Sequence, residues 1–207
     1  MKKIVLLLAC IMLLFSQAEA KKGISLSFGF GHTWAINGEM DKATGGKGNY
    51  FNLSGDYELT SLGSDQYFTF LVGLKFSLPR FYGERITYAS DPGGLKTINS
   101  DWHWTAFCSY VKVLIDKNKK PLVPYAKFGL GLYHLSIDYN PATYLGTISE
   151  SYFGYMIGFG AEYNIGRFAF FAELEDNIIP HTNLSLIDHK VRNCIFLNPQ
   201  LGISYRF

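Results

Sequence analysis

The side chains that could do chemistry in this chain are charged residues set into stretches where apolar residues alternate with small or polar ones. They comprise five acidic and four basic residues: Asp56, Glu58, Lys75, Lys127, Glu162, Arg167, Glu173, Glu175 and Arg206. Charges in a narrow interior of low dielectric must pair or become neutral. We therefore predict a mixed-sign network that fills an enclosed interior, with Glu162 and Arg167 facing each other across a tight turn at residues 164–166.

Other residues with metal-binding or nucleophilic side chains are scattered. His181, Asp188 and His189 share one polar stretch but follow no metal-site spacing, so we interpret them as exposed loop residues. Cys108 and Cys194 each lie in an apolar stretch, which favours unpaired small hydrophobic residues over a disulfide framework. A formal net charge of +2 provides no strong field for nucleic acid. We expect no metal, no cofactor and no nucleic-acid partner.

The first twenty residues form a targeting pattern. Lys2 and Lys3 precede an apolar run at residues 4–15, and the small residues Ala18 and Ala20 follow. This three-part pattern is typical of a secretory signal peptide and is too short for a spanning helix. A lipoprotein signal ending at Cys10 is disfavoured, because the apolar run continues past that cysteine. We predict a cleaved signal at residues 1–20 and one barrel domain at residues 21–207.

The charged residues lie on segments with a period of two, which is the period of a half-buried β-strand. In the last segment, Ile203 and Tyr205 share an apolar face while Ser204 and Arg206 share the opposite face. This is the lipid-out, lumen-in pattern of a transmembrane barrel strand. We predict eight strands, at residues 24–35, 49–60, 66–77, 100–115, 122–137, 150–163, 167–175 and 195–207. Residues 100–115 are apolar on both faces, so their register stays open.

The connections between these segments alternate in length. We predict long polar loops at residues 36–48, 78–99, 138–149 and 176–191, and short turns at residues 61–65, 116–120 and 164–166. Beyond the signal, no apolar run approaches the ~18 residues of a spanning helix, so a closed barrel is the remaining membrane solution. The sequence predicts an all-β fold, a closed eight-stranded antiparallel up-and-down barrel. A soluble barrel is the alternative, but it would carry charges along its outer face.

The last eight residues carry a family resemblance. Gln200, Gly202, Tyr205 and Phe207 combine a polar residue, a glycine and two aromatic residues, and this resembles the C-terminal assembly signal of outer-membrane barrels. The whole chain resembles small eight-stranded outer-membrane proteins of the OmpA and OmpX type, in the outer membrane protein beta-barrel domain group. The resemblance implies a monomer in the bacterial outer membrane, surrounded by lipid and lipopolysaccharide. It also implies periplasmic chaperones and the barrel assembly machinery as partners during biogenesis.

One residue departs from the pattern of these barrels. Pro199 cannot donate to a strand ladder, and a closed barrel has no edge strand on which to place it. We expect a bulge or a lost hydrogen bond there, and the register of the last strand near Pro199 stays open.

A second resemblance concerns catalysis. His134 and Ser136 stand two residues apart, with Glu150 further along the chain. This arrangement resembles that of lipid A deacylases, which are outer-membrane barrels, and it would imply a serine nucleophile activated by histidine. The Asn-Ala pair that follows the family's serine is replaced here by Ile137 and Asp138, and Glu150 has the opposite strand parity. We therefore interpret His134 and Ser136 as polar residues at a strand end.

Three functions remain open from the sequence. The first is a non-enzymatic barrel with a plugged lumen, whose four outer loops serve surface interaction or envelope structure. The second is a narrow porin-like channel for ions or small solutes. The third is the lipid A-modifying enzyme. We favour the first, because eight strands enclose room for side chains but not for a wide pore.

Overall fold

The alternating segments form one closed antiparallel ring in the computed structural model, which describes residues 23–62, 67–90, 94–115, 121–140, 147–185 and 190–207. The predicted signal peptide lies outside these residues. The ring's eight strands are β1 (Ile24–Ala35), β2 (Lys47–Leu62), β3 (Phe68–Ser77), β5 (Gly94–Ile115), β6 (Leu122–Asn140), β7 (Ile148–Ile165), β8 (Phe168–Ile179) and β11 (Cys194–Arg206). They pair in the order β1-β11-β8-β7-β6-β5-β3-β2, and pairing of β2 with β1 closes the ring. The prediction of an all-β, eight-stranded up-and-down barrel is confirmed.

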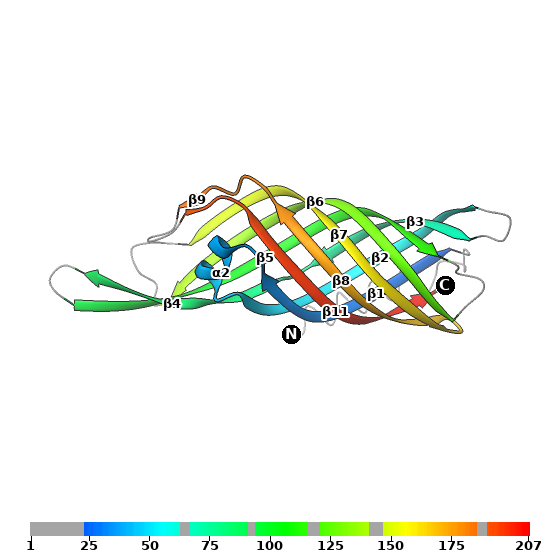
Figure 1. Cartoon of the computed structure of the whole chain (residues 1–207), viewed down its shortest axis with the longest axis horizontal. Coiled ribbons are helices and arrows are strands. Elements are labelled where there is room, and N and C mark those ends of the chain that lie inside the picture. Colours follow the sequence, from blue (N-terminus) through cyan, green and yellow to red (C-terminus); the bar gives the residue numbers. More distant parts are fainter. Residues whose placement is uncertain (1–22, 63–66, 91–93, 116–120, 141–146, 186–189) are drawn as a thin grey trace.

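The barrel has two unlike ends (Figure 1). The C-terminus and the β7–β8 turn lie at one end, which we call the turn end. The helix α2 and the strand β9 lie at the other end, which we call the loop end. At the turn end, Ile165 pairs with Phe168 across a two-residue connection in which Gly166 has a φ of 60°. Glycine suits this position because it adopts positive φ without steric cost.

Three of the predicted long loops contain regular structure. Residues 78–99, predicted to be a loop, hold a ninth strand, β4 (Arg80–Ser90), which pairs with the extended start of β5. In the sequence, Pro92, Gly93 and Gly94 form a strong turn signal, and this signal hid the strand pattern before it. Residues 36–48 hold the helix α2 (Gly38–Thr44), and residues 176–191 hold the short strands β9 (Leu184–Ser185) and β10 (Lys190–Val191). The hairpin of β4 and β5 projects beyond the barrel at the loop end (Figure 1).

Pro199 interrupts one ladder without shifting it. Against β8 it pairs with Leu174 in unbroken register. Against β1, Gly31 pairs with Gln200 and Trp34 pairs with Leu197, and both pairs belong to the same register. The two positions between them form no ladder pair with β1, so the structure shows lost pairing on the β1 side and no bulge there.

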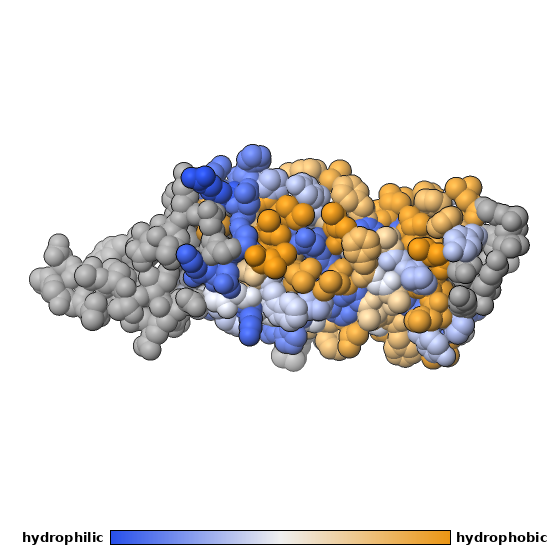
Figure 2. Space-filling model, in the orientation of Figure 1, coloured by the Kyte–Doolittle hydropathy of each residue, from blue (hydrophilic) through white to orange (hydrophobic). Residues whose placement is uncertain are grey.

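The outer surface carries a band of apolar side chains. Figure 2 shows hydrophobic residues over the middle of the molecule and toward the turn end, and strongly hydrophilic residues near the loop end. On β6 the band runs from Leu122 to Leu132, beyond which His134 points outward. Ten steps of ~3.3 Å along a strand tilted by ~40° give a height of about 25 Å, which matches the apolar band of membrane barrels. No helix among the described residues is long and apolar enough to cross a membrane.

The facing of apolar side chains reverses above this band. On β5, Phe107 and Val111 point outward, whereas Trp102 and Trp104 are fully buried in the interior. On β6, Leu135 is likewise buried beyond the band. Residues 100–115 are apolar on both faces because the strand passes from the level of the apolar band to the level above it. The structure settles which face points inward, since Trp102 and Trp104 are buried and Phe107 and Val111 are exposed.

Candidate functional site: a charged lumen

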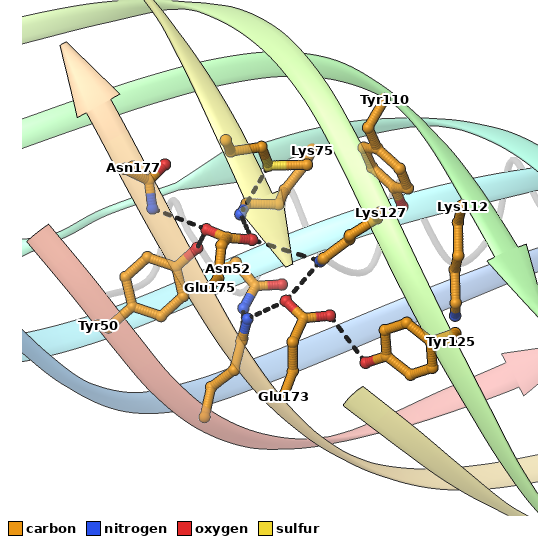
Figure 3. Close-up of polar contacts among 12 residues, drawn as sticks. Tyr50, Asn52, Lys75, Tyr110, Lys112, Tyr125, Lys127, Glu173, Glu175 and Asn177 are labelled. Atoms are coloured by element: carbon orange, nitrogen blue, oxygen red, sulfur yellow. Dashed lines mark hydrogen bonds and ion pairs between the residues drawn. The ribbon is translucent and has the colours of Figure 1, made fainter. Parts of the chain in front are cut away.

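Small residues on the inner faces of the strands make room for long polar side chains. A Cβ atom at Gly158 would lie 2.8 Å from the side chain of Lys127, and one at Gly160 would lie 2.6 Å from the ring of Tyr125. The glycines that the sequence places on the lumen face therefore face lysine and tyrosine side chains on neighbouring strands. Figure 3 shows these polar side chains pointing toward one another inside the barrel.

Glu175 lies at the centre of the polar network. Its carboxylate is fully buried, forms an ion pair with Lys75 and lies 3.3 Å from the Nζ atom of Lys127. Tyr50 donates a hydrogen bond of 2.8 Å to this carboxylate, and Asn177 donates one of 3.0 Å. Two cations and two neutral donors thus surround one buried anion, which is the compensation that a buried charge requires.

Glu173 continues the network toward the turn end. Its carboxylate lies 2.6 Å from the Nζ atom of Lys127, so Lys127 bridges Glu173 and Glu175. Tyr125 donates a hydrogen bond of 2.7 Å to Glu173, and Gln200 donates one of 2.6 Å. Side chains from several strands therefore meet at these contacts, and the two carboxylates share one cation.

A second group lies closer to the turn end. Lys112 forms an ion pair of 3.1 Å with Glu162 and a longer one of 3.9 Å with Asp56. Arg206 also pairs with Glu162, and Tyr110 donates to Asp56. The ammonium of Lys112 lies 4.3 Å from the ring centre of Tyr125, whose hydroxyl reaches Glu173, and this cation–π contact places the second group beside the first.

The network is balanced in charge and tightly filled. Its ion pairs join four acids and four bases, namely Asp56, Glu162, Glu173, Glu175, Lys75, Lys112, Lys127 and Arg206. All except the partly exposed Arg206 are buried. The cavity lined by Asp56, Lys112, Lys127 and Glu173 has a volume of only about 10 Å³, and one water needs about that much. Within the described residues, this level of the barrel is closed by side chains.

Seven of the nine charged residues predicted from the sequence take part in this arrangement. Arg167 was predicted to face the lumen opposite Glu162, but it lies exposed in the β7–β8 turn and donates to the hydroxyl of Tyr205. The prediction was wrong because alternation was counted through the turn. Glu58 lies partly buried at the turn end, where it accepts a hydrogen bond of 3.3 Å from Ser61. Lys112 was missed, because its strand is apolar on both faces.

An apolar layer lies above the charged one, at the loop end. Trp102, Trp104, Phe81 and Phe196 are at most 1% exposed, and Met40 of helix α2 packs into the same cluster. The ring centres of Trp104 and Phe196 lie 5.8 Å apart. Both cysteines are buried in this cluster, and neither forms a disulfide among the described residues. Alternation alone could not locate this layer, because it lies where the inner face changes from polar to apolar.

The candidate catalytic residues lie outside the lumen. His134 points outward, and its ring nitrogens lie 3.0 Å from the hydroxyl of Ser151 and 3.3 Å from that of Ser149. The proposed acid, Glu150, accepts a hydrogen bond from Tyr152 instead. No contact between Ser136 and His134 is found among the described residues, and no group of three or more potential ligands that could hold a metal occurs there either.

The residues of the C-terminal pattern divide between the two faces. Gln200 is buried and donates to Glu173, and Gly202 lies beside Phe171. Tyr205 and Phe207 point away from the lumen, with their ring centres 5.0 Å apart. Phe207 also donates its backbone N–H to the carbonyl of Ile24 over 3.0 Å, which joins the end of the chain to β1.

Comparisons with known proteins agree with this architecture. The family model described as outer membrane protein beta-barrel domain matches residues 4–207. The attachment invasion locus protein Ail of Yersinia pestis is 17% identical, with a TM-score of 0.50, and the match covers 90% of this chain and 100% of that one. The N-terminal β-barrel domain of Pseudomonas aeruginosa OprF is 14% identical, with a TM-score of 0.51 and coverage of 90% and 98%.

A third solved structure extends the same likeness. A major outer membrane protein of Thermus thermophilus is 15% identical, with a TM-score of 0.50 and coverage of 89% and 99%. No curated protein sequence is significantly similar to this chain. Identities this low establish the fold and leave the activity to be argued from the site itself.

Proposed function

Because this chain belongs to the outer membrane protein beta-barrel domain family, we propose that it is a non-enzymatic barrel whose lumen is plugged and whose outer end serves surface interaction or envelope structure. Its location in the bacterial outer membrane follows from the family and from its structural neighbours. In such barrels the short turns face the periplasm and the longer connections face outward. The turn end is then periplasmic and the loop end extracellular.

The observation that carries this proposal is the neutral, connected network around Glu175 and Glu173. A conducting lumen would keep water along its path and leave charged side chains solvated. Here four acids and four bases neutralise one another, and the cavity lined by Asp56, Lys112, Lys127 and Glu173 has room for about one water. Above them, the buried aromatic cluster around Trp104 supplies a second obstruction.

Two obstructions in series give the proposal a sharp test. We would measure single-channel conductance of refolded protein in planar bilayers. One variant, Lys127→Ala with Glu173→Ala, removes one cation and one anion from the charged layer and keeps the lumen neutral. A second variant, Trp104→Ala, opens the apolar layer. We expect the wild type and both of these variants to be silent, and the combination of all three substitutions to conduct.

The control is Arg167→Ala, which removes an exposed cation in the periplasmic turn and should stay silent. Folding of each variant is checked by the migration of unheated samples on gels. Reproducible small conductance steps in the wild type would show that the protein is a narrow channel whose network acts as a gate. Silence of a correctly folded triple variant would show that these side chains are not what closes the lumen.

A further inference from the structure

A groove on the membrane-facing surface ends beside a cluster of basic and aromatic residues. The groove has a volume of about 900 Å³ and runs over β1, β2, β8 and β11. Its apolar lining comes from Phe30, Phe51, Leu174, Pro199 and Leu201. Ala172 forms part of its floor, because this outward position on β8 carries a methyl group between the larger Phe170 and Leu174. We call this feature the outer groove.

Strand register defines what lies at the extracellular end of the outer groove. His32 pairs with Asn49 on β2, which in turn pairs with Arg80 on β4. One step further outward, Trp34 pairs with Lys47. All five of these side chains are on the outer face, and His32, Trp34, Lys47 and Arg80 are exposed.

The two cations are close enough to act on one ligand. Arg80 lies directly opposite Asn49, and Lys47 is two residues from Asn49 on the same face. The Cα atoms of Lys47 and Arg80 are therefore diagonal neighbours about 7–8 Å apart. Tyr82 follows on β4 and accepts a hydrogen bond of 3.0 Å from the Asn49 amide. Long basic side chains at this spacing can converge on one phosphate.

This cluster lies at the level of lipid headgroups. It begins directly above Phe30 and Phe51, which pair across β1 and β2 within the apolar band. Trp and Tyr side chains are typical of the membrane interface. On the β5 side of the cluster, His103 pairs with Arg80, and its ring lies 3.6 Å from the carboxylate of Asp138 on β6. The exposed Asp101 pairs with Tyr82. On the groove side, the acidic Asp176 lies two strands from Trp34, beyond Leu197.

We propose that the outer groove binds one phosphorylated, acylated glycolipid of the outer leaflet, with an acyl chain in the groove and a phosphate on Lys47 and Arg80. An outer-membrane barrel is surrounded by such lipids, and this one combines an apolar groove with two cations at its headgroup end. The occupant is assigned to a glycolipid, because His32, Asn49 and Tyr82 add hydrogen-bonding groups beside the cations that suit sugar hydroxyls. The inference rests on the membrane location and not on the closed lumen, so a conducting wild type would leave it standing.

The test measures retention of defined lipids by native mass spectrometry of the folded full-length mature protein. The probes are purified lipid A, phosphatidylglycerol and phosphatidylethanolamine. The headgroup variant is Lys47→Gln with Arg80→Gln, and its control is Arg167→Gln, which removes an exposed cation at the periplasmic end. The groove variant is Ala172→Phe, and its control is Ser109→Phe, an outward substitution on β5 away from the outer groove.

We expect lipid A to be retained best by the wild type and by both controls. The headgroup variant should bind about 30-fold more weakly, because each basic residue near a membrane surface contributes roughly fivefold. Ala172→Phe should weaken lipid A binding and leave the fold intact. Undiminished binding in either variant would overturn the proposed site. Equal retention of phosphatidylglycerol would overturn the glycolipid assignment in favour of an anionic phospholipid.

Discussion

Removal of the Glu175 carboxylate should destabilise the barrel more than any exposed charge substitution. Glu175 is fully buried and forms an ion pair with Lys75. In Glu175→Ala, Lys127 keeps Glu173 as its partner, whereas the buried ammonium of Lys75 loses its carboxylate. Breaking a buried ion pair from one side costs about 3–5 kcal/mol, because the remaining charge is left uncompensated.

A neutral pair of substitutions separates charge from packing. Lys75→Met combined with Glu175→Gln removes both charges with little change in volume. The amide oxygen can still accept from Tyr50, which donates to Glu175 over 2.8 Å in the wild type. Replacing both members of a buried ion pair often leaves stability nearly unchanged. We expect the double variant to lose about 1–2 kcal/mol, less than the sum of the single variants, with a coupling free energy of about 2 kcal/mol or more.

The assay is equilibrium unfolding in urea of protein folded into lipid vesicles, followed by tryptophan fluorescence. Trp102 and Trp104 are fully buried in the apolar layer, so their emission reports loss of the folded interior. Arg167→Ala is the control, because loss of this exposed charge should have little effect on the free energy of unfolding. The reasoning is refuted if Glu175→Ala costs no more than the control. It is also refuted if the effects of Lys75→Met and Glu175→Gln simply add.

Two further predictions concern the apolar layer and the C-terminus. Trp104→Ala should lower the free energy of unfolding by about 3–5 kcal/mol in the same assay, because it leaves a cavity among buried aromatic rings; a cost below that of Arg167→Ala would contradict the layer's structural role. Deletion of Phe207 should lower the amount of folded barrel recovered in outer-membrane fractions, whereas Phe207→Tyr should preserve it; equal recovery of the wild type and the deletion would show that this residue is no assembly determinant.

Alternation along the strands predicted most of the charged lumen, because side-chain direction in a strand has a strict period of two. Asp56, Glu173 and Glu175 could be placed from their apolar neighbours alone. Lys112 could not, since apolar residues occupy both faces of its strand. Arg167 was misplaced, because a two-residue turn starting at Gly166 ends the alternation before it. The sequence does indicate this turn, because Gly166 and Arg167 separate the apolar strand residues Ile165 and Phe168, and glycine is typical of the first position of a two-residue hairpin turn.

The sequence could not predict which charged residues of the network pair with one another. Glu162 was expected to meet Arg167 across the turn, but it pairs with Lys112 and Arg206 from other strands. These contacts depend on shear around the ring, which brings residues far apart in sequence to one level of the lumen. The hydroxyls of Tyr50 and Tyr125 were missed as network members for a related reason. A tyrosine on an alternating strand can serve either an interface or an interior, and only the closed ring decides between them.

The reversal of side-chain facing along β5 and β6 explains how one barrel can meet two environments. Within the apolar band, lipid surrounds the strands and the lumen holds the charged network, so Leu132 faces outward. Above the band, water surrounds the strands, and Leu135 and Trp104 turn their apolar bulk inward. At the level of the apolar band, apolar side chains are stable on the outer face, against lipid. Above the band they are stable on the inner face, away from water. The loop end is therefore a packed body with its own core, into which Met40 of helix α2 packs. A packed loop end of this kind supports the strands that carry Lys47 and Arg80 beside the outer groove, and this support favours recognition of a membrane lipid at that place.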